Sequence, residues 1–296
     1  MSDYGKLETD VHINATAEQF HEIFCSRTHH IANVADKIKG VEIHEGDWGK
    51  VGSVIVWNYV HDGKHCVAKE EVEAIDPDKN LITFKVLEGD LMEDFNSFKA
   101  TIQVSPKDKG SVVHWTFEYE KKHGHVPDPH SLLELAIEMS QEIDDHLAQG
   151  KLETDVHINA TAKHFHEIFC SRTHHIANIS SEKIKSVDIH DGEWGTVGSI
   201  IFWNYVHDGK HCVAKEVVEA IDPDKNLITF RVLEGDLLED YKSFKITIEV
   251  SPQEKGSVVH WIFEYEKKYG HITDPHTLLE LAIEVSNDID AHLAQA

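Results

Sequence analysis

Apolar and polar residues alternate along most of the chain between Leu7 and Glu120, and this period of two is typical of β-strands with one buried face. The segment Val54–Val60 is rich in the β-branched and aromatic residues that suit a pleated surface. Turn-forming residues separate such runs, which predicts an antiparallel meander. The strands are expected over Leu7–Ile13, around Val41 and Ile43, and over Val54–Val60, Cys66–Ile75, Leu81–Leu87, Phe95–Val104 and Val112–Glu120.

A short helix is expected after the first strand, because the spacing of apolar residues changes there. Phe20, Ile23 and Phe24 fall on one helical face, and Asn14 or Thr16 can cap the start of the helix. A second short helix or turn follows directly. These two elements precede the run of six strands.

A long amphipathic helix is expected after a Pro-Asp-Pro break, because apolar residues recur at helical spacing from His130 onward. The expected order is therefore a strand, two short helices, six strands and a long helix. A long helix that lies on a curved, seven-stranded antiparallel sheet is an α+β arrangement.

The whole pattern occurs twice in the chain. The run Trp57-Asn-Tyr-Val-His-Asp-Gly returns at Trp203, and most other runs return at nearly the same interval. This interval exceeds the about 20–50 residues of a solenoid unit, so each copy is a domain. Almost no linker separates the copies, and we therefore expect the two domains to touch each other. The expected domains are residues 1–149 and 150–296.

The charge balance narrows the classes of partner. The formal net charge is −25, and such a surface repels the phosphates of nucleic acids and of anionic membranes. No apolar run approaches the roughly 20 residues that a membrane-spanning helix needs. The N-terminus has no basic stretch followed by an apolar core, so no signal peptide is expected. We expect no nucleic-acid binding, no membrane insertion and a cytoplasmic location.

Cofactor and metal motifs do not occur in the sequence. The four cysteines form no C-x-x-C pair and no H-E-x-x-H frames the histidines, so neither a metal site nor a cofactor is expected. The glycine-rich run from Glu45 to Ser53 resembles a phosphate-binding loop only loosely, because a strand and not a helix follows it. The cysteines are interpreted as free buried thiols, and a Cys25–Cys66 disulfide is the open alternative.

Strand parity gathers aromatic side chains on the inward face of the sheet. In the last strand, Trp115, Phe117 and Tyr119 share one face. In the strand over residues 54–60, Trp57 and Tyr59 also share one face. Opposite the small residues of the long helix, such rings either pack the core or line a cavity. Trp115 and its counterpart in the second copy are expected deeper, in the packed core. The expected cavity residues are Phe20, Trp57, Tyr59, Phe84, Phe98, Phe117, Tyr119 and Ser140, and in the second copy Phe165, Trp203, Tyr205, Phe230, Phe244, Phe263, Tyr265 and Ser286.

Acid–base chemistry in such a cavity requires groups with shifted pKa values. The strand over residues 66–75 breaks strict alternation, because Val67 and Val72 differ in parity, and this predicts a β-bulge. Which of Lys69, Glu70 and Glu71 faces inward is therefore open. The candidate proton donors are Tyr59, Tyr119, Tyr205 and Tyr265.

Four runs carry a resemblance to a known family: Lys6-Leu-Glu-Thr-Asp-Val, His29-His-Ile, Trp57-Asn-Tyr-Val-His-Asp-Gly and Glu88-Gly-Asp-Leu-Met, each with a close counterpart in the second copy. Together they resemble the major latex proteins, a branch of the plant superfamily of birch pollen allergens and class-10 pathogenesis-related proteins. The resemblance covers nearly the whole chain. It implies the helix-grip, START-like fold, in which the sheet grips the long C-terminal helix around a large apolar cavity.

The resemblance also implies that each domain binds or carries a hydrophobic or amphipathic plant metabolite, such as a steroid, flavonoid, alkaloid or hormone-like compound, in connection with defence. The alternative is a cofactor-free isomerase, cyclase or condensing enzyme that uses acid–base residues in the same cavity. The two copies differ on the inward face, where Ala100 becomes Ile246, and the second cavity is expected to be smaller. Glu71 becomes Val217, which removes a charge from the cavity if that residue points inward.

Overall fold

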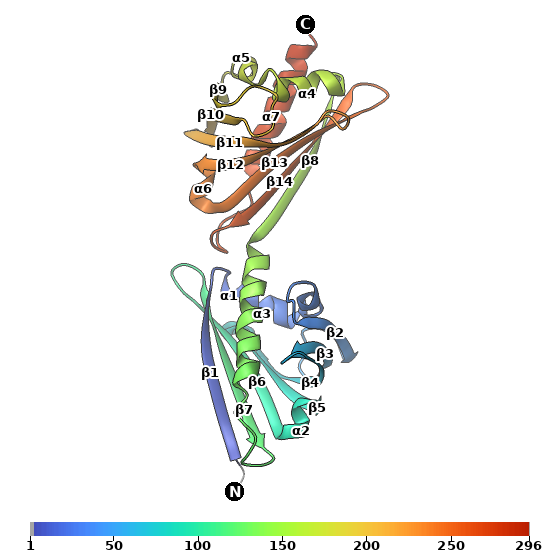
Figure 1. Cartoon of the computed structure of the whole chain (residues 1–296), viewed down its shortest axis with the longest axis vertical. Helices are drawn as coiled ribbons and strands as arrows, with labels where there is room; N and C mark the ends of the chain where they lie inside the picture. Colours follow the sequence, from blue (N-terminus) through green and yellow to red (C-terminus); the bar gives the residue numbers. More distant parts are fainter. Residues whose placement is uncertain (1–2, 296) are drawn as a thin grey trace. The chain divides into compact units, whose positions relative to one another are not determined.

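The computed structural model describes residues 3–295. The chain divides into two compact units, and the main boundary falls between Ala148 and Gln149. Each unit holds a seven-stranded antiparallel sheet and one long helix (Figure 1). The expected α+β class with two tandem copies is confirmed.

The two units repeat one order of elements. In the first unit these are β1 (Asp3–Ile13), α1 (Ala17–Cys25), η1 (Thr28–Asn33), β2 (Ile38–Glu45), β3 (Val54–His61), β4 (Lys64–Asp76), η2 (Pro77–Lys79), β5 (Leu81–Gly89), α2 (Leu91–Asp94), β6 (Phe95–Pro106), β7 (Ser111–Lys121) and α3 (His130–Ala148). In the second unit they are β8 (Gln149–Ile158), α4 (Ala162–Cys170), η3 (Thr173–His175), α5 (Ile176–Ile179), β9 (Ile184–Asp191), β10 (Ile200–His207), β11 (Lys210–Asp222), β12 (Leu227–Gly235), α6 (Leu237–Asp240), β13 (Tyr241–Pro252), β14 (Ser257–Lys267) and α7 (His276–Leu293).

Strands β2 to β7 form the expected antiparallel meander, and β1 pairs with β7 at its end. Its order is β1-β7-β6-β5-β4-β3-β2, and the second unit repeats it as β8-β14-β13-β12-β11-β10-β9. Within each unit the long helix lies across one face of the sheet (Figure 1). Apolar residues from the helix and from the inner face of the sheet form one core in each unit.

The long helix α3 is joined to the first strand through a buried carboxylate. Asp144 accepts hydrogen bonds from the backbone N–H groups of Asn14 at 3.0 Å and of Ala15 at 2.8 Å. Thr16 caps α1, because its side chain accepts from the backbone N–H of Gln19. Of the two capping residues considered, Thr16 therefore takes that role, and Asn14 connects the start of the fold to α3.

A glycine in β1 allows a tyrosine to lie flat against the strand. Gly5 pairs with Tyr119 of β7, and a Cβ atom at Gly5 would lie 2.2 Å from the tyrosine ring. Any other residue at this position would displace the ring. The same arrangement holds between Gly150 and Tyr265 in the second unit.

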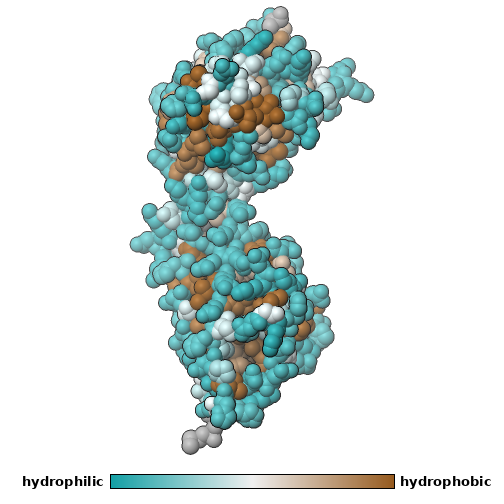
Figure 2. Space-filling view, viewed as in Figure 1, coloured by the Kyte–Doolittle hydropathy of each residue, from teal (hydrophilic) through white to brown (hydrophobic). Residues whose placement is uncertain are grey.

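Polar side chains cover most of the face seen in Figure 2, and apolar patches lie between them on each unit. Among the described residues, no helix is long and apolar enough to cross a membrane.

All four cysteines are free, so the open alternative of a Cys25–Cys66 disulfide is wrong. Within residues 3–295, no group of three or more His, Cys, Asp or Glu side chains is arranged to hold a metal ion.

Candidate functional site

Each unit contains a cavity between the inner face of its sheet and its long helix. The volumes are about 90 Å³ in the first unit and about 100 Å³ in the second. An engineered apolar cavity of about 150 Å³ takes up benzene, whereas pockets for drug-sized ligands measure about 300–1,000 Å³. A small apolar group therefore needs little rearrangement, and a larger ligand requires wall side chains to move.

The cavity wall is apolar except at one end. In the first unit the wall consists of Phe24, Ile38, Trp57, Tyr59, Ala68, Glu70, Phe84, Leu91, Phe98, Ala100, Ile102, Trp115, Phe117, Leu132, Leu135, Ala136 and Met139. These residues come from the sheet, from α1 and α2, and from the first half of α3.

The second wall repeats the first with two changes of residue type. Ala100 is replaced by Ile246, and Met139 by Val285. The expectation that Ile246 makes the second cavity smaller is wrong, because the volumes are nearly equal. The shorter side chain of Val285 on the helix offsets part of the volume that Ile246 adds on the sheet.

Most of the aromatic residues expected at the cavity do lie on its wall. These are Trp57, Tyr59, Phe84, Phe98 and Phe117 in the first unit, and Trp203, Tyr205, Phe230 and Phe263 in the second. Phe244 is fully buried beside Phe263 and Tyr265 and does not belong to the second wall. Trp115 and Trp261, expected deeper in the core, line the cavities.

Two expected cavity residues of the first unit, and their counterparts in the second, lie behind the wall. Phe20 is 0% exposed and packs against Phe24, and its counterpart Phe165 is equally buried. Ser140 is also 0% exposed and, like Ser286, is not part of the wall. The helical pattern predicted that these side chains point inward. It did not predict that the residue one turn away on the same helix lies between each of them and the cavity.

Ser140 acts on the wall through a tryptophan. The indole N–H of Trp115 donates to Ser140 Oγ at 2.9 Å, and Ser140 donates in turn to the carbonyl of Ala136 at 2.7 Å. Trp261 and Ser286 repeat the contact in the second unit. This hydrogen bond holds the N–H edge of Trp115 against the helix, while its ring lines the cavity.

Tyr119 is held away from the cavity by an acidic partner. Its hydroxyl donates to Asp128 at 2.6 Å, and Asp128 also pairs with Lys121 at 2.8 Å. Burial and the Asp128 carboxylate raise the pKa of the phenol. Tyr265 makes the same contact with Asp274 at 2.6 Å. Neither Tyr119 nor Tyr265 lies on a cavity wall, so of the four candidate donors only Tyr59 and Tyr205 face the site.

The pairing of β3 with β4 decides which charged residue faces inward. Ala68 lies opposite Trp57 and Glu70 lies opposite Ile55, so Glu70 shares the inner face with these residues. Lys69 and Glu71 lie on the other face. Val72 is buried and Val67 is exposed, so alternation along β4 continues between them, and the register shift between Lys69 and Glu70 places its extra residue, Leu87, in β5. The bulge in β4 lies beyond them, between Val72 and Ala74.

Glu70 is the one ionisable carboxyl among the described wall residues of the first unit. Burial raises its pKa from 4.5 to about 7, and burial raises the pKa of Glu216 in the second unit to about 8. The indole N–H of Trp57 faces the Glu70 carboxyl and lowers this pKa in part, without reaching the distance and angle of a hydrogen bond. A carboxyl that holds its proton near neutral pH can both accept and donate.

Two further polar groups at this end lack partners. Within the described part of the chain, the Trp57 indole N–H has no hydrogen-bond partner, although Trp57 is only 7% exposed. The same holds for Trp203, which is 9% exposed. The hydroxyl of Tyr59, on the same face of β3, also makes no hydrogen bond to residues 3–295. Each cavity therefore has a polar end formed by β3 and β4, or by β10 and β11.

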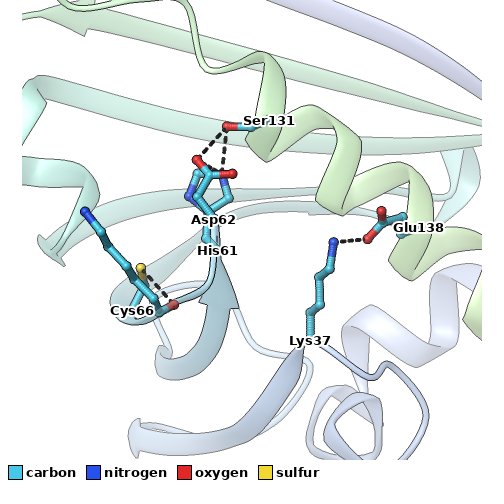
Figure 3. A network of polar contacts seen from close by, with 7 residues as sticks. Lys37, His61, Asp62, Cys66, Ser131 and Glu138 are labelled. Carbon is cyan, nitrogen blue, oxygen red and sulfur yellow. Dashed lines mark hydrogen bonds and ion pairs between the residues drawn. The ribbon is translucent and has the colours of Figure 1, made fainter.

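Polar contacts join the long helix α3 to the end of β3 and to the segment before β2 (Figure 3). His61 Nε2 lies 2.9 Å from Ser131 Oγ, and Ser131 donates to Asp62 at 3.3 Å. Lys37, just before β2, pairs with Glu138 of α3. These contacts lie between the sheet edge and the first half of α3, so they hold the helix over the wall.

The other motifs of the sequence have local structural roles. In the glycine-rich run, Ser53 Oγ accepts from the backbone N–H of Asp47 at 3.0 Å and donates to its carbonyl at 2.7 Å. Trp48 of the same run packs against the ring of His29 at 5.1 Å. Burial raises the pKa of Cys25 to about 11, so this thiol stays protonated. None of these residues lies on a cavity wall.

Glu70 is the wall residue that sequence reasoning left undecided. The repeat contained only part of the signal, because Glu71 becomes Val217, whereas Glu70 and Lys69 are both retained, as Glu216 and Lys215. Glu71 lies on the outer face, so its replacement removes no charge from the cavity.

Comparisons with known proteins agree with the repeat. Residues 2–150 and 148–296 each match the model of the pathogenesis-related protein Bet v 1 family. The chain is 54% identical to MLP-like protein 34 of Arabidopsis thaliana, over 98% of this chain and 96% of that protein. It is 52% identical to MLP-like protein 28 of the same plant, over 98% of this chain and 92% of that protein. These two relatives are therefore similar over both units.

A solved structure matches one unit. The crystal structure of major latex-like protein 151 from Panax ginseng is 39% identical, and the match covers 49% of this chain and 97% of that chain with a TM-score of 0.48.

Proposed function

The chain belongs to the pathogenesis-related protein Bet v 1 family, and from this premise we propose that each unit binds one hydrophobic or amphipathic small molecule in its cavity. The observation that carries the proposal is the apolar cavity between sheet and long helix, which both units contain at corresponding residues. Apolar surface transferred from water to such a wall contributes about 25 cal/mol per Å².

The ligand class that we propose is a plant metabolite of the steroid, flavonoid, alkaloid or hormone-like kind. We also propose that the protein acts in the cytoplasm in connection with defence. Both statements rest on the family and not on a particular residue.

A cavity-filling substitution tests the proposed function. Ala68→Leu with Ala214→Leu places larger side chains on the two walls, while Val67→Leu with Val213→Leu enlarges the next residue on the exposed face. The full chain is titrated with one steroid, one flavonoid and one alkaloid by isothermal titration calorimetry. We expect the wall variant to lose at least tenfold in affinity for every ligand that the wild type binds, and the control to keep it. Equal affinities in the two variants would contradict binding in the cavity.

Cofactor-free acid–base catalysis is the second candidate function, and the raised pKa of Glu70 favours it. In this reaction Glu70 acts as the base, and Tyr59 donates a hydrogen bond to the developing oxyanion. The test is product that accumulates beyond one equivalent per cavity. Tyr59→Phe with Tyr205→Phe should then reduce turnover about 100-fold and change affinity little. Unchanged turnover would remove these tyrosines from the reaction.

A further inference from the structure

The polar end of each cavity holds a buried hydrogen-bond donor without a partner. The indole N–H of Trp57 has no partner within the described residues, and Tyr59 and Glu70 lie on the same wall, where Glu70 supplies the one carboxyl. A buried N–H without a partner costs about 1–3 kcal/mol. The second unit repeats the arrangement with Trp203, although other wall residues differ between the units.

We propose that this end of the cavity is a subsite for a hydroxyl group, so that each unit selects an uncharged apolar molecule that carries a hydroxyl at one end. The hydroxyl oxygen accepts a hydrogen bond from the Trp57 indole N–H, and its proton is donated to Glu70. In the second unit Trp203 and Glu216 take the same roles. This inference rests on the proposed function, and it specifies the ligand class.

Other polar groups fit the subsite less well. An ammonium group donates to Glu70 but offers no acceptor, so it leaves the Trp57 N–H unpaired. A carbonyl oxygen accepts from Trp57 but cannot donate to the carboxyl once that group is ionised. Because the pKa of Glu70 is about 7, both forms of the carboxyl occur near neutral pH. A hydroxyl group satisfies both forms, since it accepts and donates at once.

Three probes of equal size test the proposal on the full chain: benzyl alcohol, ethylbenzene and benzylamine. The protein is labelled with [¹⁵N]tryptophan, and the indole N–H signals of its six tryptophans are followed by NMR. Trp57→Phe and Trp203→Phe assign the two relevant signals. We expect benzyl alcohol to bind about tenfold more tightly than ethylbenzene, which is the order of one net hydrogen bond to a buried carboxyl. We also expect it to move the Trp57 and Trp203 signals downfield relative to ethylbenzene.

A substitution in one unit then separates the subsite from the rest of the cavity. Glu70→Met should reduce the preference for benzyl alcohol to about onefold in the first unit, with ethylbenzene binding unchanged. Glu71→Met, the neighbouring change on the outer face, should keep the preference. The second unit, read through Trp203, serves as a control within the same molecule.

The outcomes distinguish the two proposals. If none of the probes binds either unit, the proposed function fails together with the subsite. If ethylbenzene binds as tightly as benzyl alcohol, the cavity is a binding site but the hydroxyl subsite is wrong. Tightest binding of benzylamine would also overturn the subsite, in favour of a cation. Indole signals that stay at the same position with both neutral probes would show that Trp57 takes no part.

Discussion

Two tryptophans in each cavity differ in how their indole N–H groups are satisfied. Trp115 donates to Ser140, whereas Trp57 has no partner within residues 3–295. Ser140→Ala with Ser286→Ala leaves a buried N–H unpaired in each unit, so we expect the free energy of unfolding to fall by about 1–3 kcal/mol per unit. Urea unfolding measures it. The exposed pair Ser105→Ala with Ser251→Ala should stay within about 0.5 kcal/mol of the wild type. An equal effect of both pairs would contradict this role of Ser140.

The buried carboxyls predict a pH dependence of stability. The folded state holds the Glu70 proton up to a pH of about 7, while the unfolded chain releases it near 4.5. The folded state therefore binds more protons in this window, and stability falls as pH rises through it. The loss is about 3 kcal/mol in the first unit, since one pKa unit corresponds to about 1.4 kcal/mol.

Glu70→Gln with Glu216→Gln removes this dependence, because glutamine stays neutral. We expect the melting temperature of the variant, relative to the wild type, to rise between pH 5 and pH 9. Differential scanning calorimetry at the two pH values measures the change. A constant difference between the two proteins would show that both carboxyls ionise in the folded state as they do in the unfolded chain.

At this scale the sequence predicts which faces side chains take, but not which partners they meet. The parity of Trp57 and Tyr59 was sufficient to place them on the wall. The parity of Tyr119 was equally clear, yet its hydroxyl reaches Asp128 in the segment between β7 and α3. Such a contact depends on how a loop returns to the sheet, and residue spacing along a strand contains no information about it.

Among the elements, α3 depends on one carboxylate for its attachment to the start of the fold. Asp144→Ala removes the acceptor for the backbone N–H groups of Asn14 and Ala15, and we expect a loss of about 3 kcal/mol in the first unit. Hydrogen exchange of these two amides should accelerate, while the equivalent amides of the second unit stay protected. The neighbouring exposed change, Asp145→Ala, is the control, and the second unit already has alanine there. Unchanged exchange in Asp144→Ala would contradict the attachment.

The start of an element was predicted well where its hydrophobic pattern continues over many residues. The helix from His130 and its counterpart His276–Leu293 begin where the pattern places them. The β-bulge expected in the strand over residues 66–75 is confirmed and lies between Val72 and Ala74, although Val67, whose parity suggested it, is an exposed residue in the regular part of the strand. A single exposed valine breaks an alternating pattern in the same way as a bulge does, and only the pairing with β3 distinguishes the two.

For the whole molecule, the two sites are similar in size, and the two differences between their walls predict modestly different selectivity. Ala100→Ile with Met139→Val gives the first wall the residue types of the second. We expect any difference in ligand preference between the units to disappear in this variant, because the other described wall positions agree in type. Titration of the full chain, read separately through Trp57 and Trp203, measures the two preferences. A ligand preference that still differs between the units would show that residues outside the walls determine selectivity.

The expected contact between the two domains stays a prediction.

The central claim is that each unit carries one small hydrophobic molecule in the cavity between its sheet and its long helix. Native mass spectrometry of the full chain purified from its own tissue tests this claim most directly. We predict a bound species at up to two equivalents per chain, whose mass belongs to a compound with a hydroxyl group on an apolar skeleton. Ala68→Leu with Ala214→Leu should remove it, and Val67→Leu with Val213→Leu should retain it. Protein that is free of any small molecule, and that takes up none from an extract of the same tissue, would contradict the claim.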